Sequence, residues 1–328
     1  MRLSRLTIAS SLALVAACSS DHRDPTGTIL PLPVHASVEL AFSGSAPLFN
    51  SRANAINDSA VVVGFGTLSA VDVSRAAVWS PPSYAFAFLP GLGTHGASVA
   101  NAIAKDGTVG GQACENSGAC HPVYWRAGTI RQLDGVGQVN AICSCDSHTM
   151  IGDVVVDGAA HGALWVDEVL IDVGVPTGFT NATLVSVAHG NIVGNAYHGT
   201  AGSPGPQTAF RWAPSGGWTQ LDGTGPVNDV NASGTAVGAS NVLWANGAST
   251  ATPIPDGSST TAVNDSGVVA GTFRGDNPFD VPGTWTQSGG WVMVGSNMNS
   301  TVTAINNPGA VVGFFHDQGE DFAELWQP

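Results

Sequence analysis

Short clusters of Asn, Asp, Ser and Gly recur along the chain, and their oxygen atoms could bind a metal ion. The clearest clusters are Asn57-Asp58-Ser59, Asn264-Asp265-Ser266-Gly267 and Asn306-Asn307-Pro308-Gly309. A calcium site needs six or more oxygen ligands and several carboxylates, whereas each cluster offers at most one acid. The same residue types satisfy the backbone of tight turns. The sequence therefore predicts repeated hairpin turns, with no metal site and no cofactor.

Cysteine is the second residue type with possible chemistry. Four cysteines follow the N-terminal segment, namely Cys114, Cys120, Cys143 and Cys145. An even number in an exported protein favours disulfides, and a Cys114–Cys120 bond would close a small loop. Cys143 and Cys145 are two positions apart, where strain makes a mutual bond less easy, so pairing across units stays open. Metal binding by Cys143-Ser144-Cys145 is the weaker alternative.

Known catalytic patterns give no candidate residue in this sequence. His-Glu-x-x-His, the Gly-x-Ser-x-Gly elbow and a phosphate-binding glycine loop are all absent from the 328 residues. His121 and His161 each lie four residues before a tryptophan, in equivalent places of neighbouring units. We expect these two histidines to be structural, and we predict no catalytic residue.

The polar clusters belong to a unit that occurs seven times. Each unit has a short apolar segment, a tight turn, a Val-rich segment that ends in Gly, and then a Trp. Successive marker glycines are 47, 41, 42, 44, 33 and 42 residues apart. A period of about 40 to 45 residues with four short strands is typical of a propeller blade. The markers are Gly64, Gly111, Gly152, Gly194, Gly238, Gly271 and Gly313, followed by Trp79, Trp125, Trp165, Trp212, Trp244, Trp285 and Trp326.

This pattern predicts an all-β, seven-bladed β-propeller of four-stranded blades. The last unit stops at Pro328 directly after its Trp segment and lacks a fourth strand. Residues 39–44 resemble the missing piece when compared with residues 86–91. We therefore expect an N-terminal strand over Val38–Phe42 to complete the last blade beside Leu325-Trp326, which hides two sheet edges.

A four-stranded meander separates the connections into two faces. The first-to-second and third-to-fourth turns lie on one face, called here the turn face. The second-to-third loops and the crossings to the next blade lie on the other, the loop face. Binding residues concentrate on variable loops of a rigid scaffold, so we expect them on the loop face. The candidates are Tyr197, His198, Arg274, Asp276, Asn277 and Asp280, and the Arg274-Gly275-Asp276 triplet is interpreted as a chance match.

The N-terminal residues indicate export. Arg2 and Arg5 precede a short apolar run, and Val15-Ala16-Ala17-Cys18 resembles a bacterial lipobox. An ordinary secretory signal is the alternative. We expect residues 1–17 to be a lipoprotein signal peptide, Cys18 to be lipidated, residues 18–36 to form a tether, and residues 37–328 to form the propeller.

The charge of the chain limits its partners. The formal net charge is −14, and it becomes −16 once Arg2 and Arg5 are removed. Lys105 is the only lysine. Nucleic-acid binding needs clustered Lys and Arg, so a nucleic-acid partner is not expected. Anionic lipid headgroups are unfavourable for the same reason, and the membrane is expected to be contacted through the lipid anchor alone.

The repeat resembles a known family. Gln207-Thr208-Ala209-Phe210-Arg211-Trp212, followed by residues 217–221, is similar to the extracellular HAF repeat, whose unit reads His-Ala-Phe-x-Trp and continues to Ala-Ile-Asn-x-x-Gly-x-Val-Val-Gly. His121 and His161 keep the leading His, which the other units have lost. The resemblance covers nearly the whole mature chain. It implies an exported bacterial propeller-like protein and assigns no reaction.

These observations lead to one expected function with two alternatives. We expect a binding or scaffold module, lipid-anchored at the bacterial outer membrane or cell surface, that presents its loop face to protein or glycan. An enzyme with a pocket at the channel mouth on the loop face is the first alternative. A purely structural surface protein is the second.

Overall fold

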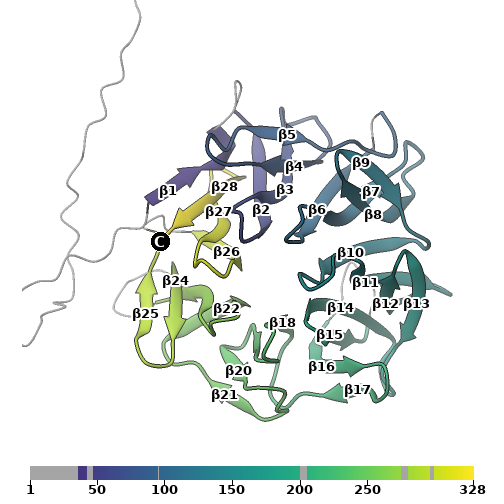
Figure 1. Cartoon of the computed structure of the whole chain (residues 1–328), viewed down its shortest axis with the longest axis vertical. Helices are drawn as coiled ribbons and strands as arrows, with labels where there is room; N and C mark the ends of the chain where they lie inside the picture. The colour runs from purple at the N-terminus through teal and green to yellow at the C-terminus, as the bar shows by residue number, and fades with distance from the viewer. Residues whose placement is uncertain (1–35, 43–46, 95, 200–204, 275–279, 296–298) are drawn as a thin grey trace, which may run out of the picture. The chain divides into compact units, whose positions relative to one another are not determined.

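The computed structural model describes residues 36–42, 47–94, 96–199, 205–274, 280–295 and 299–328. His35–Pro328 forms one compact unit. Seven four-stranded antiparallel sheets, the blades, surround a common axis (Figure 1). The one helix among the described residues is a single turn, and none is long and apolar enough to cross a membrane.

The blades follow one another along the chain with their strands in sequential order, except that the N-terminal β1 is the outer strand of the last blade. Blade 1 is β2 (Asn50–Ile56), β3 (Val62–Thr67), β4 (Arg75–Trp79) and β5 (Phe86–Phe88); blade 2 is β6 (Ser98–Ile103), β7 (Val109–Cys114), β8 (Cys120–Arg126) and β9 (Thr129–Gln132); blade 3 is β10 (Gly137–Ile142), β11 (Thr149–Val156), β12 (Ala159–Val166) and β13 (Val169–Gly174). Blade 4 is β14 (Asn181–Ala188), β15 (Asn191–Tyr197), β16 (Gln207–Ala213) and β17 (Gly217–Gln220); blade 5 is β18 (Val227–Val230), β19 (Ala236–Gly238), β20 (Val242–Trp244) and β21 (Ala251–Pro253). Blade 6 is β22 (Gly257–Val263), β23 (Val269–Phe273), β24 (Val281–Thr286) and β25 (Gly290–Met293); blade 7 is β26 (Ser300–Ile305), β27 (Val311–Asp317), β28 (Glu320–Gln327) and the N-terminal β1 (Ala36–Glu39).

The N-terminal strand closes the ring, as the sequence predicts. β1 pairs antiparallel with β28, from Ala36 opposite Gln327 to Glu39 opposite Glu324. The strand is shorter and begins earlier than expected, because Leu40–Phe42 turns into a 3-10 helix. Leu40 and Ala41 are fully buried in the apolar cluster between blades 7 and 1. Closure thus joins the two ends of the chain through both a strand pair and a shared core.

Every blade carries a β-bulge at the same place in its first strand. A bulge sets two residues opposite one on the partner strand and bends the strand locally. The register skips Asn54 in β2, and the equivalent residue is skipped in each other blade. Those residues are Asn101, Asn140, Val185, Asn228, Thr261 and Thr303.

The bulge explains the marker glycine. A Cβ on Gly64 would lie 1.9 Å from the carbonyl oxygen of Arg52, two residues before the bulged Asn54. The other six marker glycines face the equivalent carbonyl oxygen at 1.9–2.7 Å. Real Cβ atoms do not approach backbone oxygen so closely, so each bulge requires a residue without a side chain.

The bulged side chains connect neighbouring blades. In five of the seven blades the bulged residue donates a hydrogen bond to the backbone oxygen that precedes the bulge of the next blade. Thr303 Oγ1 donates to Ala53 (2.6 Å) and so links the last blade to the first. The other four bonds are Asn54 to Ala100 (2.9 Å), Asn101 to Val139 (3.0 Å), Asn140 to Leu184 (2.9 Å) and Asn228 to Thr260 (2.8 Å).

The marker tryptophans pack between blades in five units. Trp79, Trp125, Trp165, Trp244 and Trp326 are almost completely buried. Trp79 Nε1 donates to the carbonyl of Leu40, in the segment that leaves the preceding blade (3.1 Å). In blades 4 and 6 the marker tryptophan is half-buried instead. There the strand-four residues Trp218 and Trp291 bond the preceding blade, through the carbonyls of Val173 (3.2 Å) and Pro255 (2.8 Å).

The close approach at the bulge makes a marker glycine irreplaceable. We expect Gly313→Ala to lower the free energy of unfolding by more than about 2 kcal/mol, because its Cβ would meet the carbonyl of Thr301 at 1.9 Å. Gly216→Ala is the control, since that Cβ meets nothing within 4 Å. Urea unfolding followed by tryptophan fluorescence measures both. Equal stability of the two variants would contradict this account of the glycine.

Candidate functional site

The first strands meet around the axis and leave a hollow at the turn face. Its volume is about 280 Å3, and residues from all seven blades line it. Asn57, Asp58, Asp265 and Asn307 lie at its rim, and Asp229 lies in its wall. The four rim residues belong to the repeated polar clusters of the sequence, whereas Asp229 does not. Their hydrogen bonds decide whether they are available to a ligand.

The first Asn of each cluster holds its own turn and the next blade together. Asn306 Oδ1 accepts from the backbone N–H of Ala310 (2.8 Å), and its Nδ2 donates to the carbonyl of Asn57 in the next blade (3.0 Å). Asn57, Asn231 and Asn264 are used in the same way. Their Nδ2 atoms donate to the carbonyls of Ala104 (3.2 Å), Asn264 (2.9 Å) and Asn306 (3.2 Å). These four residues are called the Asn latches below.

The acids of the clusters also bond neighbouring turns. Asp58 accepts from the backbone N–H (3.0 Å) and the amide (3.2 Å) of Asn307. Asp265 accepts from the backbone N–H of Ala232 (2.9 Å) and from the same Asn307 amide (3.0 Å). Both oxygens of each carboxylate therefore have a protein donor. The clusters act as turn and blade connectors, in agreement with the sequence interpretation of turn chemistry.

Blades 2, 3 and 4 depart from this pattern. Ala104, Cys143 and Ala188 occupy the place of the Asn latch. In blade 3 the turn contains a disulfide between Cys143 and Cys145. The sequence disfavours this pairing, because the two cysteines are only two positions apart. A second disulfide joins Cys114 and Cys120, which face each other across β7 and β8.

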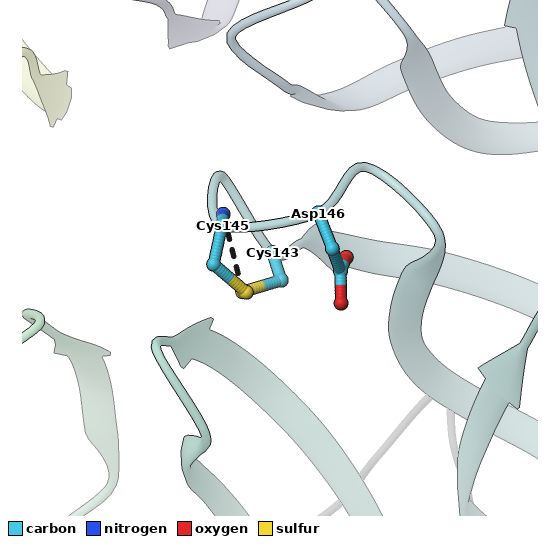
Figure 2. A group of neighbouring side chains, drawn as sticks. All are labelled: Cys143, Cys145 and Asp146. Atoms are coloured by element: carbon cyan, nitrogen blue, oxygen red, sulfur yellow. Dashed lines mark hydrogen bonds between the residues drawn. A yellow bond between two sulfur atoms is a disulfide. The ribbon is translucent and has the colours of Figure 1, made fainter.

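Cys143, Cys145 and Asp146 form the one group of three potential metal ligands among the described residues (Figure 2). Their ligand atoms lie within 4.8 Å of one another. A cysteine binds metal as a thiolate, and both sulfurs are in a disulfide here. The arrangement in this oxidised form is therefore not a metal centre.

A Ser–Asp pair lies in the wall of the hollow. The residue after the bulge is Ala in five blades, namely Ala55, Ala102, Ala141, Ala262 and Ala304, but Ser186 in blade 4 and Asp229 in blade 5. Ser186 Oγ donates to Asp229 Oδ1 (2.6 Å), and the N–H of Val263 in blade 6 donates to Oδ2 (2.8 Å). The pair joins three blades. Sequence reasoning missed it, although aligning the units at the bulge reveals both departures.

The Asp229 carboxyl resists ionisation. Burial raises the pKa of Asp229 from 3.8 to about 6. Hydrogen bonds from Ser186, Val263 and Val230 oppose that rise, and the nearby charge of Asp265 adds to it. A carboxyl with a raised pKa in a hollow is a common property of functional sites and also of buried connectors. Both oxygens of Asp229 already hold protein donors, which favours the connector.

The four predicted loop-face residues that the structure describes belong to two different blades, blade 4 and blade 6. Tyr197 is buried at the end of β15, and burial raises its pKa. His198 is exposed and stacks on Phe179, with ring centroids 5.3 Å apart. Arg274 and Asp280 form an ion pair (3.1 Å) in blade 6, beside a surface hollow of about 400 Å3. Asp276 and Asn277 lie outside the described residues.

The loop face instead carries an apolar patch that sequence reasoning missed. Phe49, Leu68, Val71 and Val73, called here the blade 1 patch, are 38%, 48%, 92% and 44% exposed. Two surface hollows, of about 410 and 490 Å3, meet at Leu68. The sequence signal is the loop between β3 and β4, where Leu68-Ser69-Ala70-Val71-Asp72-Val73 places apolar residues in a long connection.

Comparison with known proteins supports the fold alone. No family model and no curated protein matches the chain. Among solved structures, the β-propeller domain of the trilobed protease from Pyrococcus furiosus, described as an open velcro topology, matches at 12% identity and TM-score 0.56, over 84% of this chain and 95% of that one. TolB from Acinetobacter baumannii (8%, TM-score 0.46, 86% and 65%) and Trypanosoma rangeli sialidase with sialic acid (9%, TM-score 0.40, 94% and 56%) are more distant. The chain is a seven-bladed β-propeller.

The raised pKa of Asp229 gives stability a pH dependence of known sign. Between its unfolded pKa of 3.8 and its folded pKa of about 6, the folded state binds more protons than the unfolded state. The free energy of unfolding of the wild type therefore falls as the pH rises through this range, and the full loss is reached above pH 6. At ~1.4 kcal/mol per pKa unit, the difference is at most about 3 kcal/mol.

Asp229→Ala, which installs the residue of five other blades, removes this dependence. We expect the free energy of unfolding of the wild type, minus that of Asp229→Ala, to be larger at pH 4 than at pH 7.5 in urea titrations. Ser186→Ala keeps the carboxyl and should keep the dependence. A difference that is the same at both pH values would show that burial does not control this group.

Proposed function

We propose that this chain is an exported, lipid-anchored binding module that recognises a protein through the loop face of its propeller. The observation that carries the proposal is the blade 1 patch. Four of the ten exposed large hydrophobic side chains among the described residues belong to it. Contiguous exposed apolar side chains mark interaction sites on soluble proteins. The resemblance to HAF repeats and the lipobox-like Val15–Cys18 segment support export.

The chain direction in blade 7 is consistent with a loop face that is available to a partner. β1 begins at Ala36 opposite Gln327, next to the β26–β27 turn, and therefore starts at the turn face. A tether from Cys18 joins the propeller at that face. Eighteen extended residues span at most ~60 Å. A lipid on Cys18 would thus be connected along the chain to the turn face and not to the loop face.

The chemistry of the patch favours protein over glycan. Leu68, Val71 and Val73 are aliphatic, and aliphatic surface is stabilised by burial against other apolar side chains. A glycan presents hydroxyl groups that need polar partners. Neighbouring Asp72 and Arg75 line the same hollow and provide a polar rim, which is the usual composition of a protein-binding surface.

The Ser186–Asp229 pair is the observation that favours an enzyme. It combines a hydroxyl and a carboxyl of raised pKa in the central hollow. However, Asp229 also accepts from the backbone of Val230 and Val263, so the carboxyl has no oxygen free of protein donors. The binding module is therefore the better-supported function.

Lipidation is tested on Cys18. We expect the full chain, produced in a bacterium that processes lipoproteins, to incorporate labelled palmitate and to sediment with membranes. Cys18→Ser should abolish the labelling, because that thiol is the acylated atom, whereas the Cys145→Ser control should keep it. Labelling that persists in Cys18→Ser, or a wild-type chain that is released unlabelled, would contradict the anchor.

Partner binding is tested on the patch. We expect Leu68→Ser with Val71→Ser to reduce in-cell cross-linking of the full chain to its protein partner at least tenfold, equivalent to about 1.4 kcal/mol. Val166→Ser with Val169→Ser changes two exposed residues next to the β12–β13 turn, on the turn face, and is the matched control. Cross-links that survive in the patch variant, or that disappear in both variants alike, would contradict recognition through the blade 1 patch.

A further inference from the structure

The Cys143–Cys145 disulfide lies at the rim of the central hollow. It occupies the first turn of blade 3, where blades 1, 5, 6 and 7 have an Asn latch, and Ser144 lines the hollow. Asp146 fixes the rest of the turn by accepting from the backbone N–H groups of His148 and Thr149, both at 2.9 Å. The disulfide is thus held on an ordered turn at a solvent-accessible edge.

The two sulfurs of this disulfide are in different environments. Cys143 is 1% exposed and belongs to the apolar cluster between blades 3 and 4, with Ile151, Leu184 and Val187. Cys145 and Asp146 are exposed, and they follow Cys143 in the same turn (Figure 2). A thiolate attacks a disulfide at the sulfur it can reach. We therefore expect a thiol from solution to attack the exposed Cys145 and not the buried Cys143.

The buried sulfur has a hydrogen-bond donor. The backbone N–H of Cys145 donates to Cys143 Sγ at 3.3 Å, shown dashed in Figure 2. A donor to a sulfur that becomes negatively charged favours the charged form. The same bond and the core packing keep Cys143 beside Cys145 after the disulfide opens. Cys143 is thus placed both as the leaving group and as the resolving thiol of the reverse step.

We propose that Cys143-Ser144-Cys145 is a thiol–disulfide exchange site whose substrates are exposed thiols without additional negative charge. A substrate thiolate attacks Cys145 Sγ, the bond to Cys143 breaks, and its electron pair remains on Cys143 Sγ as a thiolate that accepts from the backbone N–H of Cys145. The product is a mixed disulfide on Cys145. In the reverse step the Cys143 thiolate attacks Cys145 Sγ and releases the substrate thiolate. A second substrate thiol can instead attack the substrate sulfur, giving a substrate disulfide and a reduced Cys143/Cys145 pair.

The carboxylate of Asp146 makes the site disfavour substrate thiols that carry an additional negative charge. Its oxygen lies within 4.8 Å of both sulfurs. Burial opposes ionisation of Asp146, but hydrogen bonds from Thr149 and His148 outweigh burial and lower its pKa, so the carboxylate is charged at neutral pH. The thiolates of thioglycolate, mercaptoethanol and cysteamine carry net charges of −2, −1 and 0. A fixed negative charge at this distance disfavours the first relative to the others.

The first experiment determines which sulfur reacts. The full chain carrying Cys18→Ser is exposed briefly to mercaptoethanol, quenched with acid, alkylated after unfolding and analysed by mass spectrometry. We expect the adduct on Cys145 and a free thiol at Cys143, at thiol concentrations that leave Cys114–Cys120 closed and the near-ultraviolet circular dichroism unchanged. An adduct on Cys143, equal opening of Cys114–Cys120, or opening only upon unfolding would overturn the proposal.

The second experiment tests the charge preference with Asp146→Asn, which preserves the turn acceptor. For each thiol, the rate constant of the variant is divided by that of the wild type, so the thiol's own reactivity cancels. Relative to mercaptoethanol, we expect this ratio to be about threefold higher for thioglycolate and about threefold lower for cysteamine at low salt. Equal ratios for the three thiols would remove Asp146 from substrate selection.

Discussion

The ring depends on the β-bulge in the first strand of every blade and on the hydrogen bond that the bulged residue of five blades gives to the next blade. The bulge turns one side chain sideways, towards the backbone of its neighbour. Asn54, Asn101 and Asn140 use an amide for this bond, and Thr303 uses a hydroxyl to join blade 7 to blade 1. Five of the seven blades are linked to the next blade in this way, whereas Val185 in blade 4 has no polar group for such a bond.

This constraint explains what the sequence could predict. The marker glycines, the polar turns and most marker tryptophans follow from the bulge and from packing between blades, so their period indicates seven blades and closure by the N-terminal strand. The shorter closing strand could not be foreseen, because Leu40 and Ala41 satisfy the apolar pattern of a strand while packing as a 3-10 turn. In blade 4, Trp218 instead of the marker Trp212 bonds the preceding blade, and this also depends on tertiary packing.

The candidate sites were less predictable because they are departures from the repeat. Ser186 and Asp229 stand out only when the seven units are aligned at their bulges, because the residue after the bulge is alanine in the other five blades. Cys143 replaces an Asn latch, and its burial beside an exposed Cys145 can be seen only in the structure. Among the loop-face candidates, Tyr197 proved buried. Three of the four residues of the blade 1 patch lie in the β3–β4 loop, whose apolar composition is visible in the sequence but whose exposure is seen only in the structure.

The central claim is that the repeated Asn and Asp residues connect turns and blades and do not bind a repeated ligand. A crystal structure of the protein grown in millimolar calcium tests it most directly. The account predicts the Asn306 amide on the carbonyl of Asn57, the Thr303 hydroxyl on the carbonyl of Ala53, and turns without bound ions. Calcium coordinated by Asn57, Asp58 or Asp265, with the inter-blade bonds broken, would contradict it.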